Sequence, residues 1–317
     1  MAISFTAVTD QGTAPAAPAT PQRPRRPRRR DKLAGWAYAA PTAVFVLIFF
    51  VVPIGIVARM SASDWTLFGG DRGWNAPGNY QKALDDRLLL PAVWFTVKYT
   101  VVTTVILLGL ALLLALLVQE SSRWTGFLRT AFLVPSALGL ASASLLFYAL
   151  YSPQSSPVNT PLRLLGVTDQ PISFLGTPIS ALWSTVILIV WRFAGFYMLL
   201  LLVGLQSIPG DVYEAAHLDG AGRLQTFRHI TLPLLRSSLA LCTILCVTGS
   251  LLAFDQFYIL TKGGPDNSTI TIVQLVYNMA FGGQNDLGRA AALSILVLVA
   301  LLAINALQFR GLRGKEN

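Results

Sequence analysis

Charged side chains inside apolar stretches are the residues of this sequence that are best placed to do chemistry. Arg192 lies close to the middle of the run 179–205, which contains no other charged residue. A charge at the centre of a bilayer costs about 2.5–3.5 kcal/mol on insertion scales, so Arg192 must face a cavity or a partner. Its fork of donors suits solute hydroxyls or phosphate, while an ion pair or hydrogen bonds to free carbonyls explain it equally well.

A second set of polar residues follows a helical spacing. Cys246, Ser250 and Ala253 are spaced i, i+4, i+7, so they share one face of a helix. Asp255 comes where the same apolar run ends, and it either contacts a solute or is simply solvated at a helix end. As the leading interpretation, Cys242 and Cys246 are both apolar filler, because free cysteine packs like a small hydrophobe. A purely apolar packing face is the alternative interpretation of this strip.

Catalytic and metal-binding patterns are absent from the sequence. His217 and His229 have no acids or cysteines nearby with the spacing of metal ligands, so no metal site is expected. No cluster of Ser, His, Cys and acidic residues falls in the apolar runs, so an enzyme is not expected. No G-x-x-x-x-G-K-[ST] phosphate loop is present, so we expect this chain to bind no nucleotide cofactor.

The elements that must position these residues are membrane helices. Of the 317 residues, 54% are apolar and 12% are charged, against roughly 25% charged in soluble domains. This composition excludes a soluble enzyme, a secreted disulfide scaffold and a disordered protein. A bilayer core about 30 Å thick needs about 20 helical residues to cross it. Six apolar runs approach or exceed that length, which predicts an all-α membrane protein with six transmembrane helices: 36–58, 94–118, 128–151, 179–205, 237–254 and 290–309.

The distribution of basic residues sets the predicted orientation. With the N-terminus inside, 15 Lys and Arg residues fall on the cytoplasmic side and seven on the outer side, as the positive-inside rule favours. Both termini are then cytoplasmic. Residues 1–32 are too poor in large apolar side chains to fold, so they are predicted to form a disordered basic tail, and 313–317 a short C-terminal tail. The arginines of this tail are interpreted as a signal that keeps the N-terminus in the cytoplasm, in preference to a nucleic-acid-binding arm. No nucleic-acid partner is therefore expected.

The longest cytoplasmic loop of this topology, residues 206–236, has the most detailed local pattern. Asp211 is expected to cap a short helix, with Glu214 three residues later completing a capping box. Asp219-Gly220 should end that helix, because glycine suits the left-handed residue that follows a helix end. A second helix over 223–230 would then lead into the fifth span. Taken alone, this pattern fits either an amphipathic linker on the lipid headgroups or a docking element for a partner.

This loop resembles the EAA loop of binding-protein-dependent ABC importer permeases. The shared residues are Glu214-Ala215-Ala216, Gly220 and Ile230-Thr231-Leu232-Pro233. The longer form Asp219-Gly220-Ala221 points to the carbohydrate-uptake branch. The resemblance covers residues 33–312, and segment 260–265 is similar to that of the first permease subunit of maltose and glycerol-phosphate importers. Further matching residues are Gly78-Asn79-Tyr80, Pro135, Trp191 and Gly288-Arg289-Ala290-Ala291.

The resemblance implies the type I importer permease fold, with a cytoplasmic coupling helix, in the bacterial cytoplasmic membrane. It implies three kinds of protein partner: a second permease subunit in a heterodimer, two ATPase subunits that bind ATP and Mg²⁺, and an extracytoplasmic solute-binding protein. ATP hydrolysis would then take place on the ATPase subunits. The residues that would dock onto an ATPase subunit are Glu214, Ala215, Ala216, Asp219, Gly220 and Ala221.

Alignment with maltose-type relatives adds solute-facing positions on the third and fourth spans. The candidates for the pathway are then Ser136, Arg192, Phe193, Cys246, Ser250, Ala253 and Asp255. Maltose-type relatives have larger polar groups where this chain has Ser250 and Ala253, so we do not expect a maltose-like set of hydrogen bonds. The implied solute is a sugar or a glycerol-phosphate-like molecule. The alternative is a self-sufficient secondary transporter, but such proteins use acids inside the membrane, and none lies deep in the six runs.

Overall fold

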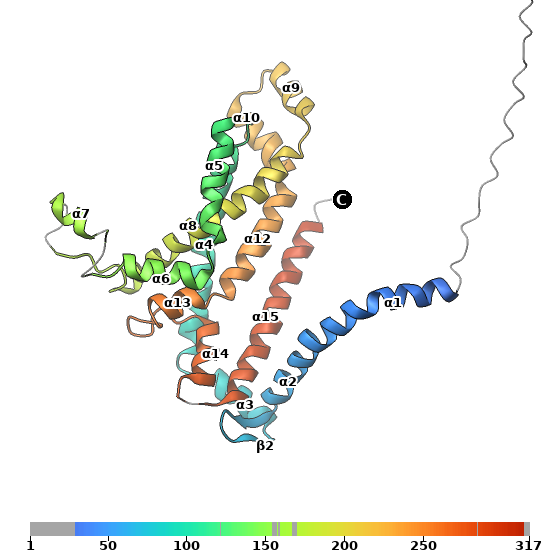
Figure 1. The fold of residues 1–317 in the computed structure, drawn as a ribbon, viewed down its shortest axis with the longest axis vertical. Helices are drawn as coiled ribbons and strands as arrows, with labels where there is room; N and C mark the ends of the chain where they lie inside the picture. The colour runs from blue at the N-terminus through green and yellow to red at the C-terminus, as the bar shows by residue number, and fades with distance from the viewer. Residues whose placement is uncertain are drawn as a thin grey trace, which may run out of the picture. The chain divides into compact units, whose positions relative to one another are not determined.

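The computed structural model describes residues 29–120, 122–153, 157, 159–166, 170–283 and 285–313 (Figure 1). Most of the predicted tail 1–32 therefore lies outside the described residues, and its last four residues already belong to the first helix. Of the predicted tail 313–317, only Arg313 is described, at the end of the last helix. The chain divides into two compact units, Met1–Ile54 and Gly55–Asn317, and each is described by itself.

The first unit contains one long apolar helical segment. Helix α1 (Arg29–Val46) runs into the π-turn η1 (Leu47–Val51), and helix α2 (Val52–Ser61) follows and ends in the second unit. Pro53 has no backbone N–H to donate within the helix, and the π-helical turn ends two residues before it. The stretch Tyr38–Ser61 is long and apolar enough to cross a membrane, which agrees with the predicted run 36–58.

The second unit begins with a small hairpin that a buried asparagine holds in place. Strands β1 (Ser63–Thr66) and β2 (Gly70–Trp74) pair antiparallel, and helix α3 (Ala76–Leu84) follows. The fully buried Asn79 donates from Nδ2 to the carbonyls of Ser61 (3.0 Å) and Ser63 (2.7 Å). A Cβ on Gly288 would lie 2.5 Å from the Ser63 carbonyl oxygen. The segments 78–80 and 288–291 therefore meet at this hairpin.

Four long helices form the centre of the second unit: α4 (Leu89–Leu117), α8 (Pro178–Gln206), α12 (Arg236–Leu251) and α15 (Leu287–Arg313). Helix α4 has its most extensive contact with α8, and α12 packs against both. Their facing side chains form the main apolar core, and a smaller core joins α15 to α3, α4 and α14 (Ile272–Phe281). Arg289 at the start of α15 also pairs with Asp86, just before α4.

The predicted third span 128–151 is not one continuous helix, which corrects the sequence interpretation. Helix α5 (Arg123–Leu133), the 3₁₀ turn η2 (Val134–Ala137) and helix α6 (Leu140–Leu150) are joined with a bend of 94°. Pro135 cannot donate a backbone hydrogen bond, and Gly139 is extended as the N-cap of α6. A Cβ on Gly195 would overlap the Phe132 carbonyl, so α8 approaches α5 closely at this break.

The remaining described helices lie in the connections. Between α8 and α12 are α9 (Gly210–Leu218), α10 (Arg223–Thr226), the π-turn η3 (Phe227–Thr231) and α11 (Leu232–Leu234), and the segment 223–234 meets α12 at a bend of 66°. Two other connections contain α7 (Asn159–Leu164) and α13 (Asp255–Leu260), which adjoins α14. Within the described residues, four helices are long and apolar enough to cross a membrane, or up to six if each bent pair counts as one span.

Candidate functional site

The loop between α8 and α12 contains the predicted docking residues. Helix α9 begins after Pro209, whose extended backbone makes it the N-cap, and no side chain caps the helix. The capping box that we predicted from Asp211 and Glu214 is therefore wrong. Asp211 lies in the first turn instead, where a carboxylate interacts favourably with the helix dipole. The short helix and its position in the loop are as predicted.

The end of α9 is a Schellman motif centred on Gly220. Gly220 has a φ of +78°, its N–H donates to the His217 carbonyl, and the Ala221 N–H donates to the Ala216 carbonyl. These two bonds satisfy carbonyls that the helix end leaves unpaired. The Tyr213 and Thr231 hydroxyls lie 3.3 Å apart, which links α9 to η3. The predicted left-handed glycine is confirmed, and the loop has a defined shape.

The six predicted docking residues do not all face outward. Glu214, Ala215, Asp219 and Gly220 are exposed, Ala221 is half-buried, and Ala216 is only 6% exposed. Ala216 therefore packs inside this chain, whereas Ala215 offers a small side chain at the surface. Two large apolar side chains that we had not singled out are strongly exposed on the same loop, Leu218 (90%) and Leu224 (79%).

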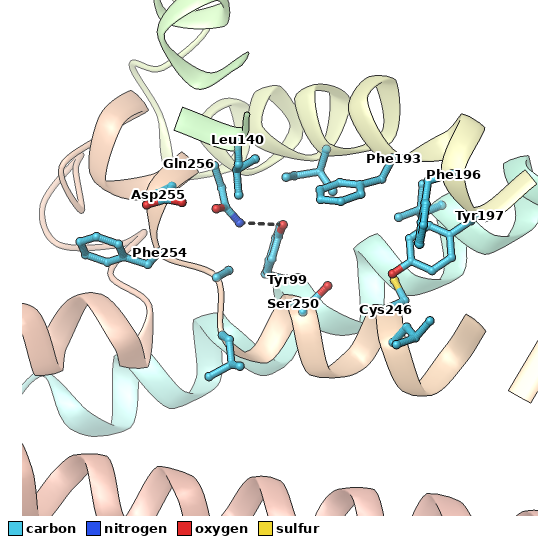
Figure 2. Close-up of a pocket in the computed structure, with 16 residues that line it drawn as sticks. Tyr99, Leu140, Phe193, Phe196, Tyr197, Cys246, Ser250, Phe254, Asp255 and Gln256 are labelled. Carbon is cyan, nitrogen blue, oxygen red and sulfur yellow. Dashed lines mark hydrogen bonds between the residues drawn. The ribbon is translucent and has the colours of Figure 1, made fainter. Parts of the chain in front are cut away.

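A pocket of about 310 Å³ contains five of the seven predicted pathway residues (Figure 2). They are Phe193, Cys246, Ser250, Ala253 and Asp255. The pocket lies among α4, the start of α6, α8, the C-terminal half of α12 and the start of α13. Cys246 and Ser250 share the face of α12 that lines the pocket, as predicted. Ala253 also lines the pocket, but α12 ends at Leu251, so its predicted place on the same helix face is wrong and it lies in the turn before α13.

Sequence reasoning missed several residues that line the pocket. Tyr99 and Gln256 meet at the pocket, where Gln256 Nε2 donates to the Tyr99 hydroxyl at 3.2 Å (Figure 2). Gln256 is 2% exposed, and its Oε1 atom has no hydrogen-bond partner among the described residues. Gln256 directly follows Asp255, so its position next to a polar helix end was the available signal. Tyr99 lies in an apolar run and gave none.

Ser136 and Arg192 do not line this pocket. Each side chain instead donates a hydrogen bond to a backbone carbonyl on the segment of the other. Ser136 Oγ donates to the Arg192 carbonyl at 2.7 Å, and Arg192 Nε donates to the Leu138 carbonyl at 2.9 Å. The Arg192 guanidinium also lies over the Phe193 ring, 4.2 Å from its centroid. Because Leu138 belongs to the break between η2 and α6, its carbonyl is not used by a regular helix. Both hydrogen bonds thus join α8 to the broken segment.

The pocket's charge and shape define what it can bind. Among the described residues that line it, Asp255 is the only carboxylate and no Lys, Arg or His occurs. Its aromatic side chains are Tyr99, Phe193, Phe196, Tyr197 and Phe254. A concave site with apolar and aromatic walls and a few polar groups is typical of a small-molecule site. This one offers hydrogen-bond acceptors and ring faces, and no positive charge.

A family profile described as "Binding-protein-dependent transport system inner membrane component" matches residues 38–310. The chain belongs to this family. It is therefore an integral membrane transport subunit of an ABC importer, and importers of this family work with a solute-binding protein. ATP hydrolysis belongs to separate subunits of such importers, so this permease is not an enzyme.

Relatives match nearly the whole permease. The trehalose/maltose transport system permease protein MalF of Thermococcus litoralis is 34% identical, over 86% of this chain and 92% of that protein. The lactose transport system permease protein LacF of Rhizobium radiobacter is 31% identical, over 89% of this chain and 95% of that protein. A chain from a bacterial ABC transporter involved in the import of the acidic polysaccharide alginate superposes with a TM-score of 0.80 at 22% identity, over 91% of this chain and 97% of that chain. This likeness shows the permease fold.

Proposed function

We propose that this chain is one of two permease subunits through which a bacterial importer moves a neutral sugar across the cytoplasmic membrane. Two ATPase subunits would supply the work from the cytoplasm, and an extracytoplasmic binding protein would deliver the sugar. The observation that carries the proposal is the exposed α9 with its Schellman end at Gly220, in the connection between α8 and α12. Membership of an importer permease family supports an ATPase subunit as the partner of this loop.

The proposal includes six spans with both termini inside the cell. The two bent helix pairs are needed to reach six, because only four described helices qualify alone. The excess of basic residues on the predicted inner side supports this orientation. It puts α9 in the cytoplasm, and α3, α13 and α14 on the outer side. The pocket is then closer to the outer end of α12 than to its inner end, because Cys246 and Ser250 lie in the second half of that helix.

Coupling through α9 requires contacts that differ between two states of the transporter. Closure of an ATPase dimer on ATP can shift the permease only if the ATPase binds one arrangement of the spans more tightly. The exposed Glu214, Ala215 and Gly220 offer a small, close-fitting surface for that contact. The exposed Leu218 adds apolar area that a partner would bury. The hydrogen bonds of the Schellman motif fix the geometry of the end of α9.

The chemistry of the pocket favours a neutral sugar over a glycerol phosphate. An anionic solute would meet the Asp255 carboxylate and no basic side chain among the described lining residues. Sugar hydroxyls can instead donate to the Asp255 carboxylate, and sugar C–H faces can pack on the aromatic rings. The names of the two relatives, with trehalose, maltose and lactose as their sugars, support this class of solute.

Cysteine crosslinking tests the docking role of α9. In the complete importer, a cysteine at Ala215 should be crosslinked to an ATPase subunit by a short bifunctional thiol reagent, because Ala215 is exposed on α9. The matched control is Phe68→Cys in the hairpin, which is also exposed but lies on the predicted outer side. The unaltered chain serves as a blank, since Cys242 and Cys246 are buried. Failure of Ala215→Cys to capture an ATPase in a complex that hydrolyses ATP would refute the docking role.

A further inference from the structure

Two hydrogen bonds hold helix α8 against the break between α5 and α6. Ser136 Oγ donates to the Arg192 carbonyl at 2.7 Å, and Arg192 Nε donates to the Leu138 carbonyl at 2.9 Å. The bonds connect residues that are 56 and 54 positions apart in the chain. We call these two hydrogen bonds the crossed pair. Each bond runs from a side chain of one segment to the backbone of the other, so the crossed pair fixes the break against α8 at two points.

The Leu138 carbonyl needs a donor from outside its own helix. Leu138 ends the turn η2 with an extended backbone (ψ 140°), and the next regular helix begins only at Leu140. Within a membrane span, a backbone carbonyl without a partner is costly, because no water is available to bind it. Arg192 supplies the donor, and a hydrogen bond from a charged donor is stronger than one from a neutral donor. The break is therefore stabilised by a side chain of another helix.

The groups that Arg192 contacts adjoin two walls of the pocket. Phe193 directly follows Arg192, Leu140 lies two residues after Leu138, and both line the pocket (Figure 2). The Arg192 guanidinium lies over the Phe193 ring, 4.2 Å from its centroid, and a cation in this position attracts the ring. Arg192 itself does not line the pocket. It thus holds a lining residue on α8 and the segment that leads to a lining residue on α6.

We propose that Arg192 is a positioning residue for sugar transport: through Leu138 and Phe193 it fixes two walls of the pocket, and it does not contact the sugar. This inference rests on the proposed function. It favours the bond to a free carbonyl over the direct contact with a solute that the sequence had left open. Because no continuous helix fixes the start of α6, the position of Leu140 depends on the crossed pair.

Two substitutions of matched length separate the hydrogen bond from the charge. Arg192→Gln puts an amide nitrogen where Arg192 has Nε, so it keeps a donor for the Leu138 carbonyl and removes the charge. Arg192→Met has a methyl group at that place, so it removes the donor as well. Ser136→Ala removes the other bond of the crossed pair. Its control is Ser294→Ala, because the half-buried Ser294 donates only within α15, to the Ala290 carbonyl at 2.8 Å.

Uptake of labelled maltose, trehalose and lactose by the complete importer in proteoliposomes measures the effect. The rate is followed at increasing concentrations of sugar-loaded binding protein, so that KM reports docking of the binding protein and kcat reports the later steps, with sugar in the pocket. We expect Arg192→Met to lower kcat about 10-fold, the lower end of the range for a bond from a charged donor, with KM unchanged. A purely structural role would lower the yield of complex and not the kcat of each complex.

The other variants complete the expected pattern. Arg192→Gln should keep kcat within about 3-fold of the unaltered chain, because a neutral donor retains part of the bond. Ser136→Ala should lower kcat by less than Arg192→Met, and Ser294→Ala should leave it unchanged. Equal losses for Arg192→Gln and Arg192→Met would overturn the inference, because the charge and not the donor would then matter. Normal transport by Arg192→Met would also overturn it, since the close contact at Gly195 would then suffice to hold the break.

Ser136→Ala keeps the inference testable if the Arg192→Met complex does not assemble. A kcat lower than that of Ser294→Ala, with KM unchanged, would then support the crossed pair, and an equal kcat would overturn it. These outcomes leave the proposed function standing. Failure of the unaltered importer to take up any of the three sugars would overturn the proposed function itself.

Discussion

Gly220 illustrates how one backbone angle shapes the docking loop. Its φ of +78° is a conformation that side chains with a Cβ rarely adopt, although no other atom lies within 4 Å of the place where a Cβ would be. The strain at this position is therefore a matter of the backbone alone. A left-handed glycine at this helix end can be predicted from the sequence, because the Asp-Gly pair follows a short helical pattern. The N-cap of the same helix could not be predicted, since Pro209 and Asp211 both fit the start of a helix.

Replacement of Gly220 should weaken coupling. Gly220→Ala forces a side chain into the left-handed region at a cost of about 1–2 kcal/mol, and Gly220→Pro also removes the N–H that donates to His217. The control is Gly210→Ala on the same loop, where a Cβ also has open space and φ is not positive. We expect fewer sugar molecules moved per ATP hydrolysed for both Gly220 variants, most for proline. A Gly220→Ala importer that couples like Gly210→Ala would contradict this role of the backbone angle.

At the scale of elements, apolar runs predicted where helices lie but not where they break. The run 128–151 is mostly apolar in sequence, and the structure bends it by 94° at Pro135 and Gly139. Hydropathy averages over residues and carries no information about direction. The sequence also left two interpretations of Arg192 open, since the carbonyl that it binds, Leu138, becomes free only because of that break. Gly195 is what allows α8 to approach the broken segment.

A Cβ at position 195 should therefore destabilise the permease. Gly195→Ala places a methyl group against the Phe132 backbone, which cannot rotate away as a side chain can. Overpacking of this kind costs about 1–3 kcal/mol. Gly109→Ala in α4 is the control, because a Cβ there meets no atom within 4 Å and alanine favours a helix. Thermal unfolding in detergent should show a lower midpoint for Gly195→Ala only, and equal midpoints would mean that α8 and α5 have room to separate.

At the scale of the whole molecule, the pocket depends on contacts that no sequence pattern reveals. The spacing of Cys246 and Ser250 predicted one wall, because residues of one helix face are related by local geometry. The opposite wall required tertiary structure, since Tyr99 and Gln256 are 157 positions apart in the chain. The sequence left both a sugar and a glycerol phosphate open as solutes. The choice of a neutral sugar depends on the lining residues of the pocket, none of which is basic among the described residues.

The central claim is that this chain transports a sugar only as part of an importer driven by separate ATPase subunits. It is tested most directly by uptake of labelled maltose, trehalose and lactose into two sets of proteoliposomes. One set contains this chain alone, and the other contains the complete importer with its binding protein, with and without ATP on the side that α9 faces. We expect accumulation only in the complete set and only with ATP. Accumulation by the chain alone, driven by an ion gradient, would contradict the account and identify a secondary transporter.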